Sequence, residues 1–178
     1  HKNTAAPETD YLLLDATNAT ADSADPWNDT APDSVNIAVG QGGGVNDANN
    51  FITYAWTEIQ GFSKFGSWTG NGLADGPFIY TGFRPAFVLL KDTSSANDYN
   101  WVILDNKRDP SNSLDKRLQA SSTATEYTDV DDFADFLSNG FKWTSTNANW
   151  NASGTSYIYA AFAEAPFVNS NGVPCNAR

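Results

Sequence analysis

Apolar and polar residues alternate along most of this chain in short runs, which is the pattern of β-strands rather than of helices. FITYAWTE (51–58) and SYIYAAFAE (156–164) are rich in aromatic and β-branched residues, which favour strands. AFVLLK (86–91) is almost continuously apolar, as in a strand that is buried on both faces. Turn residues separate these runs. Further strands are predicted at residues 11–14, 35–40, 64–68, 77–83, 100–106 and 140–145.

Three stretches depart from this pattern. In DVDDFADFL (129–137) the apolar residues fall at helical spacing and predict one or two helical turns. KRLQA (116–120) fits neither a strand nor a helix clearly. Residues 15–34 are rich in Asp, Asn, Thr, Ala and Pro and predict an irregular connection that Trp27 anchors.

Short strands in this number predict an all-β fold, namely an antiparallel β-sandwich of the jelly-roll or concanavalin-like kind. An internal repeat accompanies them. FITYAWTE (51–58) aligns with YIYAAFAE (157–164) at an offset of 106 residues, and the same offset carries Leu12 onto Leu118. Independent convergence of strand-and-turn patterns is the alternative explanation.

The repeat suggests a division of the chain. Residues 1–60 would be the C-terminal half of a preceding unit, residues 61–167 a complete β-sandwich unit, and residues 168–178 a tail. The first unit is then truncated, which agrees with the absence of Met from the sequence. Because isolated sheet edges are avoided, we expect residues 1–60 to pack on the rest of the chain or on another copy.

Charge narrows the set of partners. The chain carries 10 Lys and Arg against 21 Asp and Glu, a net charge of −11. Nucleic acid and anionic membrane surfaces attract basic proteins, so neither is an expected partner. No apolar run is long enough to span a bilayer. The acidity indicates either solubility or a cation-binding role.

Candidate chemistry is sparse. His1 is the single histidine and Cys175 the single cysteine, which argues against a catalytic triad, a multi-His metal site and an internal disulfide. Glu58 and Glu164 could form a glycosidase-like carboxylate pair, but their equivalent places in the two repeats favour a shared structural role. The glycines of TGNGLADG (69–76) lack the Lys of a phosphate-binding loop. We therefore expect neither an enzyme nor a cofactor.

An acidic cluster is the one candidate metal site. Asp129, Asp131 and Asp132 could offer oxygen ligands to Ca²⁺. The spacing of an EF-hand is absent, and a solvated acidic loop is the alternative.

Partner contacts have better candidates. Trp27 and Trp150 lie in polar, turn-rich stretches, so they are expected to be exposed and to contact a glycan or a neighbouring subunit. Arg84, Lys107 and Arg108 are basic residues of an acidic chain, and they could pair with an acidic loop of a neighbouring copy. The alternative is ordinary surface ion pairs.

Longer motifs resemble a known family. These are FSKFGSWTGNGLADGPFIYTGFRPAFVLLK (62–91), WVILDNKRDPSNSLDKRL (101–118), DFLSNGFKW (135–143) and NASGTSYIYAAFAEAPF (151–167). Together they resemble a domain of unknown function that recurs in structural proteins of tailed bacteriophages, including tail-fibre-like and other virion proteins. The resemblance brings no catalytic residues.

The resemblance implies a non-enzymatic structural protein of the virion, in a tail fibre, an appendage or a capsid decoration. Its expected partners are other copies of itself, other virion proteins and host-surface glycans. A carbohydrate- or receptor-binding module is the alternative, whereas the single histidine disfavours a hydrolase.

Overall fold

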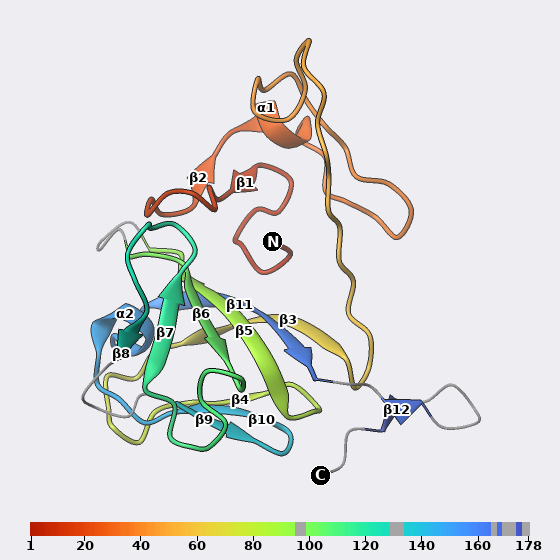
Figure 1. Cartoon of the computed structure of the whole chain (residues 1–178). Helices are drawn as coiled ribbons and strands as arrows, with labels where there is room; N and C mark the ends of the chain where they lie inside the picture. Colours follow the sequence, from red (N-terminus) through yellow and green to blue (C-terminus); the bar gives the residue numbers. More distant parts are fainter. Residues whose placement is uncertain (95–98, 129–133, 165–166, 169–173, 176–178) are drawn as a thin grey trace.

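Two antiparallel sheets make up the folded centre of the chain (Figure 1). The structure is a computed structural model that describes residues 1–94, 99–128, 134–164, 167–168 and 174–175. These residues include two helices of four residues each, α1 (Ala24–Trp27) and α2 (Ala148–Asn151). Because the helices are this short and the sheets are antiparallel, the described residues are consistent with the expected all-β fold.

The larger sheet has six strands in the order β3-β11-β5-β6-β7-β8. The first and last long strands, β3 and β11, are neighbours, and Tyr159 of β11 lies between Gly66 of β3 and Leu90 of β5. KRLQA, ambiguous in sequence, supplies β7. The bounds are β3 (Ser63–Thr69), β5 (Pro85–Asp92), β6 (Val102–Asp105), β7 (Lys116–Gln119), β8 (Tyr127–Thr128) and β11 (Ser156–Ala163).

The smaller sheet has three strands in the order β4-β10-β9: β4 (Phe78–Tyr80), β10 (Gly140–Trp143) and β9 (Ala134–Leu137). Gly140 allows β10 to approach β4 closely, because a Cβ there would lie 2.1 Å from the Ile79 carbonyl oxygen. The helix predicted over 129–137 is wrong for residues 134–137, which pair with β10 as a strand. Residues 129–133 lie outside the described residues.

Aromatic side chains fill the space between the two sheets. Trp68 of β3 stacks on Tyr157 of β11 with ring centroids 4.8 Å apart and 11° between the ring planes. Phe141 of β10 meets Tyr159 edge-on at 5.4 Å, and Trp143 lies 5.5 Å from Trp68. All five are buried. This shared core makes the two sheets one packed unit, consistent with a β-sandwich.

The N-terminal segment, residues 1–60, follows a different course above the large sheet (Figure 1). It contains α1 and one pair of two-residue strands, β1 (Asp10–Tyr11) and β2 (Ala21–Asp22). Residues 28–58 form neither helix nor strand, so the strands predicted at 35–40 and 51–58 are wrong. Their alternation suits a strand, but no strand among the described residues pairs with their backbone. Near the C-terminus, β12 (Phe167–Val168) pairs with β13 (Pro174–Cys175).

Candidate functional site

The outer face of the large sheet carries a second apolar layer. Alternation along β11 sends Tyr157 and Tyr159 into the core and Ile158, Ala160 and Phe162 to the opposite face. Phe162 makes ring contacts at centroid distances of 5.8–6.1 Å with three other aromatic side chains: Phe62, Phe65 and Phe87. An apolar sheet face of this kind needs a cover.

The N-terminal segment supplies part of that cover. The indole N–H of Trp101 donates to the Leu13 carbonyl at 2.8 Å, across 88 residues of sequence. The Lys91 ammonium, fully buried, donates to the Thr17 carbonyl at 3.0 Å. These bonds hold residues 13–17 against one end of the sheet.

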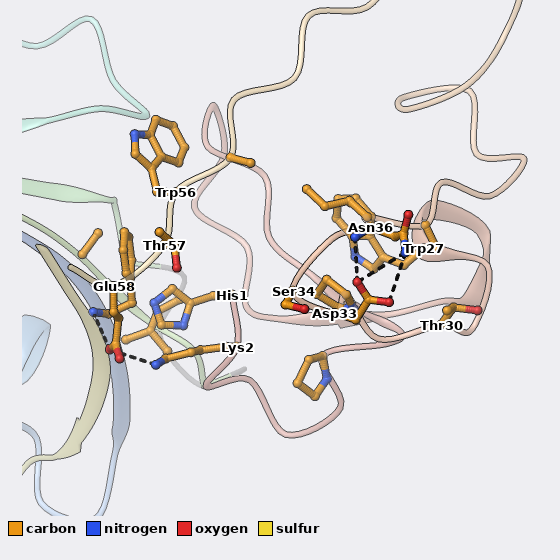
Figure 2. A pocket seen from close by; sticks show the side chains of 18 of the residues that line it. His1, Lys2, Trp27, Thr30, Asp33, Ser34, Asn36, Trp56, Thr57 and Glu58 are labelled. Carbon is orange, nitrogen blue, oxygen red and sulfur yellow. Dashed lines mark hydrogen bonds and ion pairs between the residues drawn. The ribbon is translucent and has the colours of Figure 1, made fainter.

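A cavity of about 790 Å³ remains between the N-terminal segment and the sheet. Ile158 and Ala160 of β11 belong to its sheet side, and Trp27 and Trp56 belong to the N-terminal segment (Figure 2). A cavity of this size can hold a ligand as large as a short oligosaccharide or a peptide side-chain cluster. It is therefore the candidate binding site of the chain.

Trp27 reaches the cavity from the last position of α1. Ser23 caps this helix by accepting a hydrogen bond from the Asp25 N–H, and Asn28 ends it in the left-handed conformation with φ of 54°. The Trp27 indole N–H donates to the Asp10 carbonyl at 3.0 Å, and the ring is half-buried. Trp27 thus acts as the predicted anchor, while part of its ring stays available for contact.

Glu58 is the centre of a group of charged residues in the cavity lining next to β3. Its carboxylate accepts from Lys2 at 2.8 Å, from Lys64 at 3.2 Å and from the Phe65 N–H at 3.2 Å. Burial opposes ionisation, but the bonds from Lys2, Phe65 and Lys64 outweigh it and lower the pKa of Glu58. The carboxylate is therefore a fixed negative charge at neutral pH.

Asp33 forms the polar wall on the other side (Figure 2). Its carboxylate accepts from the backbone N–H groups of Val35 and Asn36, both at 2.7 Å, and from the Asn36 amide. These bonds lower the pKa of Asp33. Asp33 and Glu58 are thus two hydrogen-bonded carboxylates of the cavity lining, and both have lowered pKa values.

The expectation that Trp150 is exposed is wrong. Trp150 is 1% exposed, because α2 turns its ring into the core, where it stacks on Trp143 at 6.1 Å. The Arg117 guanidinium lies 5.2 Å from the Trp150 ring and 4.6 Å from the Tyr127 ring. Trp150 therefore joins the core to the end of the large sheet and contacts no solvent-borne ligand.

Lys107 and Arg108 have partners within the chain. Lys107 pairs with Glu164, while Arg108 pairs with Asp105 at 2.8 Å and with Glu126 at 3.1 Å. These are ion pairs within one chain, and pairing with a neighbouring copy stays a prediction. Glu164 and Glu58 belong to separate ion pairs. Arg84 is exposed and directly precedes β5.

The acidic cluster proposed for Ca²⁺ (Asp129, Asp131 and Asp132) lies outside the described residues. Among the described residues, no group of three or more His, Cys, Asp or Glu side chains is arranged to hold a metal ion. Within the same residues, neither helix is long and apolar enough to cross a bilayer.

Comparison with protein families gives one match. The model described as Domain of unknown function (DUF7483) covers residues 1–166. The chain belongs to this family. The DUF7483 match includes the two packed sheets and the N-terminal segment that lines one side of the cavity. Neither the curated proteins nor the solved structures gave a significant match to this DUF7483 chain.

Proposed function

We propose that this DUF7483 chain is a non-enzymatic structural protein of a bacteriophage virion, in a tail fibre, an appendage or a capsid decoration. It works through contacts between β-modules, its partners are other copies and other virion proteins, and it is located in the extracellular particle. In this proposal the packed sheets are a jelly-roll or concanavalin-like module, and the chain carries a repeat of about 106 residues.

The observation that carries the proposal is a row of large apolar side chains left in solvent. Ile52 is 81% exposed, Tyr54 73% and Trp56 66%. Soluble monomers rarely expose contiguous apolar patches of this kind unless the patch binds something. The sequence of this row also matches β11, a central strand of the large sheet, which indicates that residues 51–58 can take part in a sheet.

Mass spectrometry of purified virus particles tests this role. Particles of the virus that encodes the chain should contain its peptides at a fixed copy number relative to the other structural proteins. The peptides should remain after the particles are washed in high salt, because apolar and backbone contacts survive screening. Absence of the chain from washed particles would refute the proposal.

A glycan- or receptor-binding module is the second candidate, and the cavity favours it. Trp27 and Trp56 offer indole rings of the kind that stack on sugars, and Asn36 offers an amide beside Trp27. A glycan array with the purified chain tests this. Trp27→Ala should abolish any binding, whereas Leu73→Ala, at an exposed apolar residue outside the cavity lining, should retain it.

A further inference from the structure

Residues 51–58 have the composition of a strand but no strand beside them. The segment is extended between residues 1–50, called here the N-terminal lobe, and β3, and it forms no ladder with the described residues (Figure 1). Its sequence counterpart, residues 157–164, lies in β11 with a strand on each side. Unpaired backbone groups in such a segment are a template for another strand.

The segment already has the two-faced geometry of a strand. The rings of Tyr54 and Trp56 stack at 6.1 Å with 19° between their planes, so side chains two residues apart share one side. Ile52 has the same parity. The intervening residues, Thr53, Ala55 and Thr57, are small. The face that carries residues 52, 54 and 56 is therefore apolar, and the opposite face carries small side chains only.

The free edge of β3 is a matching surface. Just after β3, the Gly70 N–H donates to the Thr155 carbonyl and the Gly70 carbonyl accepts from the Gly154 N–H, both on the β11 side. Because this direction alternates along a strand, the backbone N–H and C=O groups of even-numbered β3 residues point towards β11. Odd-numbered residues face away: Ser63 bonds Ile59 there, and the Phe65 N–H bonds the Glu58 carboxylate.

By the same alternation, Ser67 and Thr69 direct their backbone N–H and C=O groups outward. Both residues are exposed, and no described residue pairs with their backbone on that side. The second half of β3 is therefore an open sheet edge. Gly66 and Trp68 between them face the core, so a strand added there would extend the apolar layer.

The chain does not close this edge with its own residues 51–57. Ile59 and Ser63 form a single bridge and the Ser63 hydroxyl donates to the Thr57 carbonyl at 2.8 Å, but residues 51–56 lie away from β3 and run to the N-terminal lobe (Figure 1). That lobe is tied to Lys91 of β5 through Thr17, to Trp101 through Leu13, and to Glu58 through Lys2. An open edge and an unpaired strand thus coexist in one molecule.

We infer that residues 51–57 of one copy pair with the open edge of β3 in a second copy. The inference rests on the proposed assembly role and names the surface that would perform it. Backbone hydrogen bonds to Ser67 and Thr69 join the copies, and the apolar face of residues 52, 54 and 56 is buried in the contact. When the exchange is reciprocal, one two-fold axis closes both edges.

Light scattering of the full chain over a range of concentrations and at moderate salt tests the inference. Salt is needed because each copy carries a net charge of −11 and copies repel one another. We expect the apparent mass to rise from 19.2 kDa towards a dimer. A mass that stays monomeric at all concentrations overturns the inference.

Two variants should weaken dimerisation at least tenfold. Trp56→Lys places a charge on the apolar face, and Ser67→Pro removes an outward-facing N–H without touching the β3–β11 ladder. Val35→Lys is the matched control, because Val35 is 85% exposed in the same N-terminal segment but outside residues 51–57. Equal dimerisation in all three variants would overturn the inference. Circular dichroism checks that each variant is folded.

Mixed disulfide trapping distinguishes a second copy from the chain's own edge. Ala55→Cys and Ser67→Cys are made on separate chains, each with Cys175→Ser, then mixed and oxidised with diamide. A mixed disulfide dimer supports the inference. A disulfide that forms within one chain carrying both cysteines, with no mixed dimer, shows a hairpin and overturns it. Mass spectrometry of particles tests the structural role separately from the pairing. A chain that stays monomeric in light scattering but is present in washed particles would refute the pairing and leave the structural role intact.

Discussion

Trp68 and Trp56 are a matched pair for testing where the stability of this chain resides. Trp68 is 7% exposed, stacks on Tyr157, and donates its indole N–H to the Trp150 carbonyl at 3.1 Å. Truncation of a buried Trp to Ala removes its apolar burial and leaves a cavity, which costs about 3–5 kcal/mol. The lost ring stacking and hydrogen bond place Trp68→Ala near the middle or top of that range.

Urea unfolding followed by circular dichroism measures this effect. We expect Trp68→Ala to lower the unfolding free energy by about 4 kcal/mol, which corresponds to a fall of roughly 8–16 °C in Tm. Trp56→Ala, at a residue 66% exposed, should change the free energy by less than about 0.5 kcal/mol at protein concentrations where the chain is monomeric. A loss below about 1.5 kcal/mol for Trp68→Ala, or equal losses for the two variants, would refute the assignment of the core.

Three further predictions concern backbone packing and ionisation. Gly140→Ala should destabilise the fold by about 2–3 kcal/mol in urea unfolding because its Cβ would force β4 and β10 apart, while Gly43→Ala, with nothing within 4 Å, should be nearly neutral. The pKa of Glu58 is lowered below its ordinary 4.5, so its ionised form stabilises the fold above pH 4.5, and this stabilisation is lost as the pH falls through the pKa of the folded state. Glu58→Gln should therefore make the stability depend less on pH in the acid range. An unchanged dependence would contradict the ion pairs with Lys2 and Lys64. Burial raises the pKa of Tyr157 and Tyr159 to about 12, so two of the seven tyrosines should stay un-ionised in an ultraviolet titration just above pH 10. The stability that their neutral form gives is full below pH 10 and should fall as the pH approaches 12. Ionisation of all seven near pH 10 in the folded chain would contradict their burial.

Most strands of the packed sheets, though not β7, β8 and β9, could be predicted from sequence because their pattern and their environment agree. AFVLLK reads as buried on both faces, and β5 does place Val88 and Leu90 in the core while Leu89 lies half-buried on the outer face. FITYAWTE has an equally strong pattern and forms no strand. Alternation of apolar and polar residues indicates that a segment can lie in a sheet. Whether a neighbouring strand has a free edge to pair with it depends on the rest of the fold.

The candidate site was largely beyond sequence reasoning for the same reason. Trp101 lines the cavity and bonds the Leu13 carbonyl, a contact across 88 residues that no local pattern encodes. Trp150 illustrates the opposite error. The polar string ANWN suggests a surface turn, but α2 is a single helical turn that directs one large ring inward. Trp27, in an equally polar stretch, stays half-buried beside the cavity.

The neighbouring positions of β3 and β11 determine how this module would respond to pulling. Ser63, at the start of β3, lies opposite Phe162, near the end of β11, so the chain enters and leaves the packed sheets at the same end of one ladder. Tension applied through the two flanking segments would load the hydrogen bonds one after another, as in a zipper, rather than all together in shear. A fibre built from such modules joined end to end would extend at low force by peeling β3 from β11, and lateral contacts between copies would be what makes it stiff.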